Sequence, residues 1–202
     1  MVNELIERIV KNDTYHGLWL NTLSYMENVG ARKIKKCEHP IFVTETILKH
    51  ASEESRHAYY LKKQLKKLNN QSLPSYERQY LLCPKISMYY LHQLDIDVSR
   101  YLKRNYNLSQ ESLRFATYLL VTYAIEVRAD SLYPLYQEAL DVAKSTISVK
   151  NIIAEETQHL REMKYQIAKL FPTENKQVCD DVEHMEHKLF EVWISELEHS
   201  IA

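Results

Sequence analysis

The 202-residue sequence is poor in the residues that build turns and interrupt helices. It contains only two glycines and five prolines. Sheets and hairpins need such turn residues, so their scarcity favours long helices. The three cysteines form no Cys-x-x-Cys pair, which argues against a disulfide framework, a zinc ribbon or a rubredoxin-type iron site. We therefore expect an all-α protein of the reducing cytoplasm.

The sequence also lacks an excess of one charge and a long apolar run. Its formal net charge is -1, so nothing favours nucleic acid or an anionic membrane as a partner. No apolar run reaches the roughly 18 residues of a membrane span. The first residues carry acids within their apolar stretch, unlike a secretory signal. We expect a soluble protein with no nucleic-acid or membrane partner.

Apolar periodicity and breakers divide the chain into helices within one domain, residues 1–202. The expected helices are a short one at 3–10, four long ones at about 13–36, 40–68, 110–143 and 148–170, a crossover helix ending near 103, and a last helix at about 173–201. Pro40 suits the first turn of the second long helix, and Pro134 should kink or break the third. The core bundle would span about 13–170, followed by the additional C-terminal helix.

This order predicts a specific all-α architecture. Two antiparallel helix pairs joined by one long connection are typical of the ferritin-like four-helix bundle, here with a long crossover that contains an extra helix. The last helix has apolar stripes along residues 182–201 that must cover something. The pattern leaves open whether that helix forms a homodimer or covers a pocket.

Two helices carry the same short motif, Glu-x-x-His. The motif is formed by Glu54 and His57 on the second long helix and by Glu156 and His159 on the fourth. Residues three apart lie on one face of a helix, so a carboxylate and an imidazole can converge on one ion. Both pairs interrupt the apolar stripe of their helix, where a buried acid is costly unless it is paired, protonated or bound to metal.

A third Glu-x-x-His, Glu196 and His199, lies in the last turns of the chain, and we interpret it as a chance occurrence. The hairpin partners of the first two motifs supply matching acids. Glu27 and Glu126 interrupt the apolar stripes of the first and third long helices, at positions that bring each acid level with the motif on its partner helix. Gly30 costs its helix about 1 kcal/mol relative to alanine, which indicates that another backbone approaches closely there.

Four carboxylates and two imidazoles balance the charge of two divalent ions, and this oxygen-rich set suits iron or manganese. We expect two iron ions, with Mn/Fe or Mn/Mn as alternatives. Glu54 and Glu156 would bridge the ions, and the full set of metal-binding and catalytic residues would be Glu27, Glu54, His57, Glu126, Glu156 and His159. The alternative is a metal-free core network of acids and histidines.

These residues, over roughly 15–170, resemble the ferritin-like di-iron carboxylate superfamily. The acid before each motif resembles the Asp-Glu-x-x-His repeats of bacterial multicomponent monooxygenases and ribonucleotide reductase small subunits, in which it orients a ligand histidine. That resemblance implies that Glu53 holds His159 and Glu155 holds His57, whereas ordinary solvated acids are the alternative. The segment TYLLVTYAIEVRADSLYPLYQEAL is similar to small single-domain di-iron oxygenases such as cyanobacterial aldehyde-deformylating oxygenase.

The resemblance implies an oxidoreductase that activates O2 to oxidise a small organic substrate and needs a separate electron donor. Two other functions stay open: ferritin- or rubrerythrin-like iron oxidation or peroxide removal, and a metal-free helical interaction protein. Asp130 could support the site or be a surface acid. Tyrosines near the expected ligands could line a substrate pocket or store a radical, or simply form core; they are Tyr25, Tyr59, Tyr60, Tyr123 and Tyr133.

Overall fold

Helices make up most of the chain, as the sequence predicts. The computed structural model describes residues 2–38, 41, 43–68 and 72–201, and within these ranges it contains helices and no strand. The α-helices are α1 (Val2–Lys11), α2 (Asp13–Cys37), α3 (Glu45–Gln64), α4 (Pro84–Asn105), α5 (Gln110–Val142), α6 (Lys150–Leu170) and α7 (Asn175–Ser200). Short 3-10 turns follow α3 (Leu65–Lys67) and precede α4 (Arg78–Tyr80).

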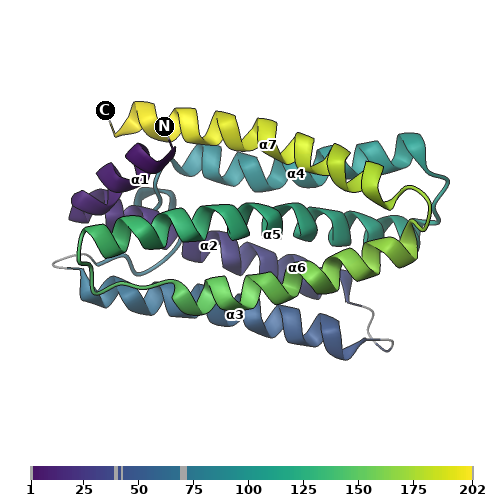
Figure 1. Cartoon of the computed structure of the whole chain (residues 1–202), viewed down its shortest axis with the longest axis horizontal. Helices are drawn as coiled ribbons and strands as arrows, with labels where there is room; N and C mark the ends of the chain where they lie inside the picture. The colour runs from purple at the N-terminus through teal and green to yellow at the C-terminus, as the bar shows by residue number, and fades with distance from the viewer. Residues whose placement is uncertain (1, 39–40, 42, 69–71, 202) are drawn as a thin grey trace.

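Two helical hairpins form the part of the molecule that positions the site. Helices α2 and α3 pack side by side, as do α5 and α6, and α2 also contacts α5. Between the hairpins, α4 carries the chain back along the length of the bundle, so that α5 runs in the same direction as α3 (Figure 1). The predicted order of two hairpins joined by a long connection that contains a helix is therefore present.

Helix α7 covers α4 and α5 on the side away from α3 (Figure 1). Its apolar stripe is buried there, with Trp193 1% exposed and stacked on Trp19 of α2 at 5.5 Å between ring centroids. Tyr90 of α4 also stacks on Trp193, with ring centroids 5.6 Å apart. Much of the apolar stripe predicted for residues 182–201 is thus buried within the chain itself.

Several helix boundaries differ from the prediction. Helix α3 begins at Glu45 and not near residue 40, because the Thr44 side chain accepts a hydrogen bond from the Ile47 amide and caps the helix. Pro40 lies outside the described residues. Helix α5 continues through Pro134, so the predicted break does not occur.

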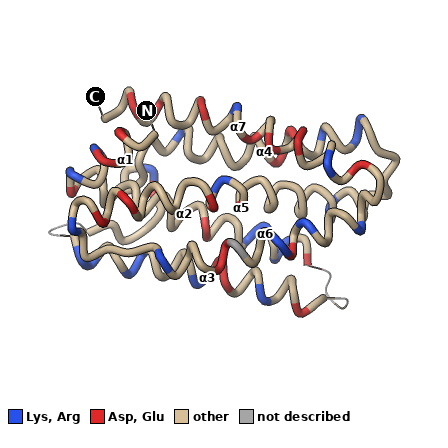
Figure 2. Tube along the Cα trace, viewed as in Figure 1, with Lys and Arg blue, Asp and Glu red and all other residues tan. Residues whose placement is uncertain are grey.

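Charged residues of both signs are distributed along the helices, and no face of one sign dominates this view (Figure 2). A search of the described residues found no helix that is long and apolar enough to span a membrane.

Candidate metal centre

The four long helices bring the six predicted residues into one buried cluster. Helix α3 contributes Glu54 and His57 from consecutive turns, and α6 contributes Glu156 and His159 in the same way. Helices α2 and α5 add Glu27 and Glu126, respectively. Exposure is 8% for Glu54 and 3% or less for both histidines, Glu126 and Glu156, while Glu27 is partly buried.

The ligand atoms of the cluster fall into two overlapping sets, each with its atoms within 4.8 Å of one another. One set consists of Glu27, Glu54, His57 and Glu156, and the other consists of Glu54, Glu126, Glu156 and His159. Glu54 and Glu156 belong to both sets. Each set could hold one metal ion, and the two shared carboxylates lie where bridging ligands between two ions would be needed.

The inward-facing nitrogen of each histidine approaches carboxylates without forming a hydrogen bond. The Nδ1 atom of His57 lies 3.1 Å from Oε1 of Glu156, and that of His159 lies 3.4 Å from Oε2 of the same carboxylate. Among the described residues, neither Nδ1 atom and neither Glu156 oxygen has a hydrogen-bond partner. Buried polar atoms are nearly always satisfied, so these four atoms together fit a centre that binds cations.

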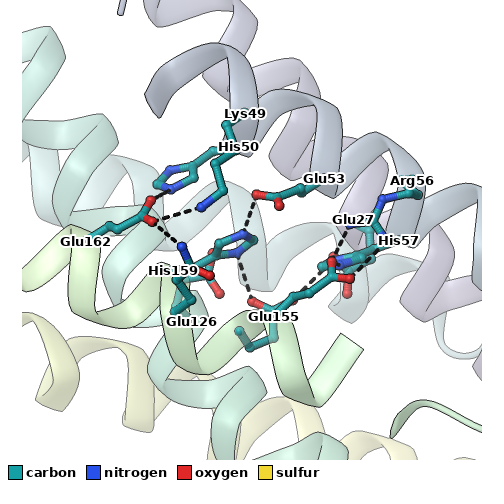
Figure 3. A network of polar contacts seen from close by, with 12 residues as sticks. Glu27, Lys49, His50, Glu53, Arg56, His57, Glu126, Glu155, His159 and Glu162 are labelled. Carbon is teal, nitrogen blue, oxygen red and sulfur yellow. Dashed lines mark hydrogen bonds and ion pairs between the residues drawn. The ribbon is translucent and has the colours of Figure 1, made fainter. Parts of the chain in front are cut away.

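The outward-facing nitrogens are held by the acid that precedes each motif, and the two hydrogen bonds cross between helices (Figure 3). The Nε2 atom of His57 lies 2.8 Å from Glu155 on α6, and that of His159 lies 2.8 Å from Glu53 on α3. The Arg56 guanidinium also binds the Glu155 carboxylate. Because Nε2 of each ring is engaged by a carboxylate, Nδ1 is the nitrogen left to bind metal.

Crowding of buried acids changes the protonation of the carboxylates. Burial, followed by the charge of Glu27, raises the pKa of Glu54 well above its usual range. Burial and the neighbouring Glu156 charge do the same for Glu126. The pKa of Glu156 is instead lowered, because the nearby Glu126 carboxyl and the His159 and His57 imidazoles stabilise its charged form and outweigh its burial. Glu156 is therefore the carboxylate that most favours the charged form, while burial and mutual repulsion shift Glu54 and Glu126 toward the protonated form when no cation is bound.

The same carboxylates favour the charged form of both histidines. Burial opposes the charge of His57, but the approach of Glu156 and Glu27 outweighs burial and raises its pKa to about 11. Burial likewise opposes the charge of His159, and Glu156 with Glu53 raises its pKa to about 9. The metal-free cluster thus keeps cationic imidazoles beside Glu156, in positions that a metal ion could take over.

Gly30 lies against the cluster, although its neighbour is not the one predicted. A Cβ atom at Gly30 would be 3.0 Å from Oε2 of Glu54 and 3.6 Å from Cδ of the same side chain. The nearest atoms thus belong to a carboxylate and not to another backbone, so the prediction of backbone contact was wrong. A side chain at position 30 would push on one of the two carboxylates that both ligand sets share.

Three polar residues extend the cluster beyond the predicted set. His50, 3% exposed, places Nε2 2.7 Å from Oε2 of Glu162, and Lys49 lies 2.8 Å from Oε1 of the same carboxylate. The His50 ring packs on that of His159 with centroids 4.8 Å apart. His50 lies four residues before Glu54 and so on the same face of α3, and this spacing was the sequence signal that could have assigned His50 to the cluster.

Other predicted participants lie elsewhere. Asp130 is exposed, and Tyr59 is 66% exposed, so neither contributes to the cluster. Tyr133 does contact it, because its hydroxyl donates a hydrogen bond to Oε1 of Glu27. The hydroxyls of Tyr60 and Tyr123 instead bind the Ser148 carbonyl and a carboxylate of α7, respectively.

Comparison of the chain with protein-family models, with curated proteins and with solved structures found no match. We therefore infer the function of the site from its geometry.

Proposed function

We propose that the protein is a non-haem di-iron oxidoreductase that uses O2 to oxidise a small organic substrate. The observation that carries the proposal is the pair of ligand sets sharing Glu54 and Glu156, with both inward-facing Nδ1 atoms free of hydrogen bonds. Oxygen-rich ligation with one imidazole per ion suits iron or manganese. Two iron ions held there would supply the redox chemistry, and a separate electron donor would reduce them.

The path of the chain supports a ferritin-like bundle as the scaffold. Helix α2 pairs with α3 and α5 pairs with α6, and the long connection through α4 joins the two hairpins. In ferritin-like di-metal proteins each of two helices gives a glutamate and each of the other two gives a Glu-x-x-His motif. Helices α2 and α5 each give the cluster one glutamate, and α3 and α6 each give it a motif, so the distribution is the same.

The residues around the cluster have separate tasks in this proposal. Glu53 and Glu155 hold the imidazole rings in place through Nε2, and they keep Nδ1 as the ligand atom. Tyr133 donates to one oxygen of Glu27 and leaves the other facing His57 at 3.6 Å. Apolar side chains line the hollow beside the cluster, including Met26 and Ile125, and they limit the access of water to the reacting groups.

The first test is metal content. Protein purified from iron-supplemented cells should contain about two iron atoms per chain by inductively coupled plasma mass spectrometry, the number that two four-ligand sets require. Its optical spectrum should show oxo-bridged charge-transfer bands that disappear on reduction and return in air. A chain without metal after anaerobic reconstitution would mean that the acids and histidines form a structural network, and the proposal would fail.

The third Glu-x-x-His provides a matched control for variants of the ligand set. Glu54→Ala or His159→Ala should lower bound iron to about one equivalent or less, because each removes a ligand from at least one set. His199→Ala should leave the iron content unchanged, since His199 lies on α7 and its Nδ1 binds the Ser195 carbonyl at 2.6 Å. Retention of two irons by Glu54→Ala would remove that residue from the proposed ligands.

A further inference from the structure

A cavity of about 530 Å³ opens between α2, α4 and α5, toward the end of the bundle at which α5 begins. Its lining includes Lys36 and Cys37 of α2, Ser99 and Lys103 of α4, and Arg114 and Tyr118 of α5. Sites for small organic ligands typically measure about 300–1,000 Å³. The cavity is therefore large enough for a small organic molecule, and its three walls come from helices of different parts of the chain.

The cavity has an excess of positive charge, although the whole chain is nearly neutral. Four cationic side chains line it, and Asp95 is the acid among its described lining residues. Asp95 pairs with Lys33 at 3.2 Å. Lys36, Lys103 and Arg114 have no acidic partner within ion-pair distance among the described residues, and the guanidinium of Arg114 instead donates to the Lys36 carbonyl at 2.9 Å. Three cationic residues without an acidic partner in the described part of the chain thus line one cavity, and this excess of positive charge favours an anion there.

The start of α5 adds to this preference. Gln110, the first residue of that 33-residue helix, lines the cavity. The N-terminus of a helix carries unpaired amide groups and a partial positive charge, both of which favour anions. This contribution has the same sign as that of the three cations.

The cationic cavity adjoins the candidate metal centre. A second hollow of about 70 Å³ shares Lys33, Val121 and Thr122 with the first. Its lining is mostly apolar, with Met26 and Leu91 among the side chains, and it also includes four glutamates of the cluster: Glu27, Glu54, Glu126 and Glu156. The two hollows are therefore neighbours, with the cationic one opening beside α5 and the mostly apolar one reaching the carboxylates of the site.

We propose that this cavity binds the substrate, and that the substrate is an amphipathic organic carboxylate. Its head group would lie among Lys36, Lys103 and Arg114, and its apolar part would extend past Val121 toward the cluster. Guanidinium and ammonium groups pair with carboxylates, and burying a hydrocarbon surface against the apolar side chains of the second hollow is favourable. The identification of the ligand as substrate rests on the proposed function, whereas the binding itself does not depend on metal.

Octanoate is the probe, with 1-octanol and octylammonium as neutral and cationic counterparts of equal chain length. Isothermal titration calorimetry of the full-length protein should show saturable binding of octanoate to one site, weakened by added salt, and at least tenfold weaker binding of both counterparts. The double variant Lys36→Gln/Arg114→Gln should bind octanoate at least tenfold more weakly. Arg32→Gln/Lys35→Gln is the matched control, because it removes the same two charges from exposed positions on α2 outside the cavity.

Cys37 provides an independent readout of where the probe binds. It lines the cavity, whereas Cys83 lines a separate hollow near the C-terminal end of α7. Alkylation by iodoacetamide, followed by peptide mass spectrometry, should show that octanoate slows modification of Cys37 and leaves that of Cys83 unchanged. Protection should be lost in Lys36→Gln/Arg114→Gln, and circular dichroism would establish that this variant is folded.

The outcomes separate this inference from the proposed function. Octanoate binding that is insensitive to salt and to the double variant would overturn the inference, and so would equal binding of 1-octanol. Tighter binding of octyl phosphate than of octanoate would overturn the carboxylate assignment. A chain that holds two irons but binds no octanoate refutes only the substrate class. A chain that binds octanoate in this charge-dependent manner but holds no metal refutes the di-iron function and leaves the anion site standing.

Discussion

Replacing Gly30 with alanine should stabilise the metal-free protein and weaken its hold on metal. Gly30 lies inside α2, where alanine is favoured over glycine by about 1 kcal/mol. For a chain of this length, that gain corresponds to an increase in Tm of roughly 2–4 °C. The new Cβ atom would lie 3.0 Å from Oε2 of Glu54, so the carboxylate must move by a few tenths of an ångström to reach an ordinary contact distance.

Such a displacement is small for a free side chain and large for a metal ligand. Metal–ligand distances tolerate changes of about 0.2 Å, and disturbing the groups that orient a ligand typically lowers metal affinity by about 10–100-fold. Because Glu54 belongs to both ligand sets, the loss should affect both ions. We therefore expect at least tenfold weaker binding in an anaerobic titration with Fe²⁺, together with a higher Tm of the metal-free variant.

Gly17→Ala is the matched control, since it makes the same exchange about 20 Å away along the axis of α2. It should leave metal affinity unchanged. Unaltered metal affinity in Gly30→Ala would refute the reasoning, because it would mean that Glu54 either has room to adjust or does not bind metal. A large fall in the Tm of the metal-free variant would also refute it, since the contact would then involve more than the end of one flexible side chain.

Three further predictions concern protons and buried charge. Loading the metal-free site at pH 7 should release at least two protons per chain, because pKa values of about 11 for His57 and about 9 for His159 keep both imidazoles protonated until a metal ion displaces their protons. The raised pKa values of Glu54 and Glu126 should add to this release. Calorimetry in buffers of different ionisation enthalpy measures the number of protons, and values near zero would contradict the stated protonation. Burial outweighs the charge of Asp13 and lowers the pKa of His16 to about 4 from 6.5, so the unfolded chain binds the additional proton between these pH values. The free energy of unfolding should therefore fall as the pH drops below 6.5, with His16 accounting for about 2 kcal/mol between about pH 8 and pH 5. Urea unfolding measured over this range should show that His16→Gln removes this part of the pH dependence. An unchanged pH dependence in the variant would exclude His16 as its source. Arg128 pairs with the buried Glu186 at 2.7 Å, so Arg128→Ala should cost about 3–5 kcal/mol because it leaves a buried charge with only the Tyr90 hydroxyl as a partner among the described residues. Adding Glu186→Leu should recover much of this loss of stability. The absence of recovery would show that the packing of Arg128, and not the buried carboxylate charge, causes the loss.

Local patterns in the sequence were sufficient to predict the helices and the gathering of the six residues. The decisive signal was a polar pair on the apolar face of a helix, since Glu54 and His57 could not stay buried there without partners. Acids at matching positions on the hairpin partners then pointed to Glu27 and Glu126. Periodicity was enough in these cases because it fixes which face of a helix a residue occupies.

Contacts between distant helices could not be predicted in the same way. Glu162 meets His50 across 112 sequence positions, and nothing in the local pattern around either residue indicates the other. The neighbour of Gly30 was assigned wrongly for the same reason. A glycine inside a helix indicates that another group lies close to it, but not whether that group is a backbone or a side chain. The start of α3 depended on whether Thr44 or a proline further upstream begins the helix, and the Thr44 side chain decides it.

The crossed hydrogen bonds of the two histidines have a consequence for how the protein assembles. His57 on α3 is held by α6, and His159 on α6 is held by α3, while each ligand set draws on both hairpins. Neither hairpin alone can therefore offer a complete set of ligands. A metal ion would bind firmly only after the hairpins have docked, and it would then stabilise the contact between the N-terminal and C-terminal halves of the bundle.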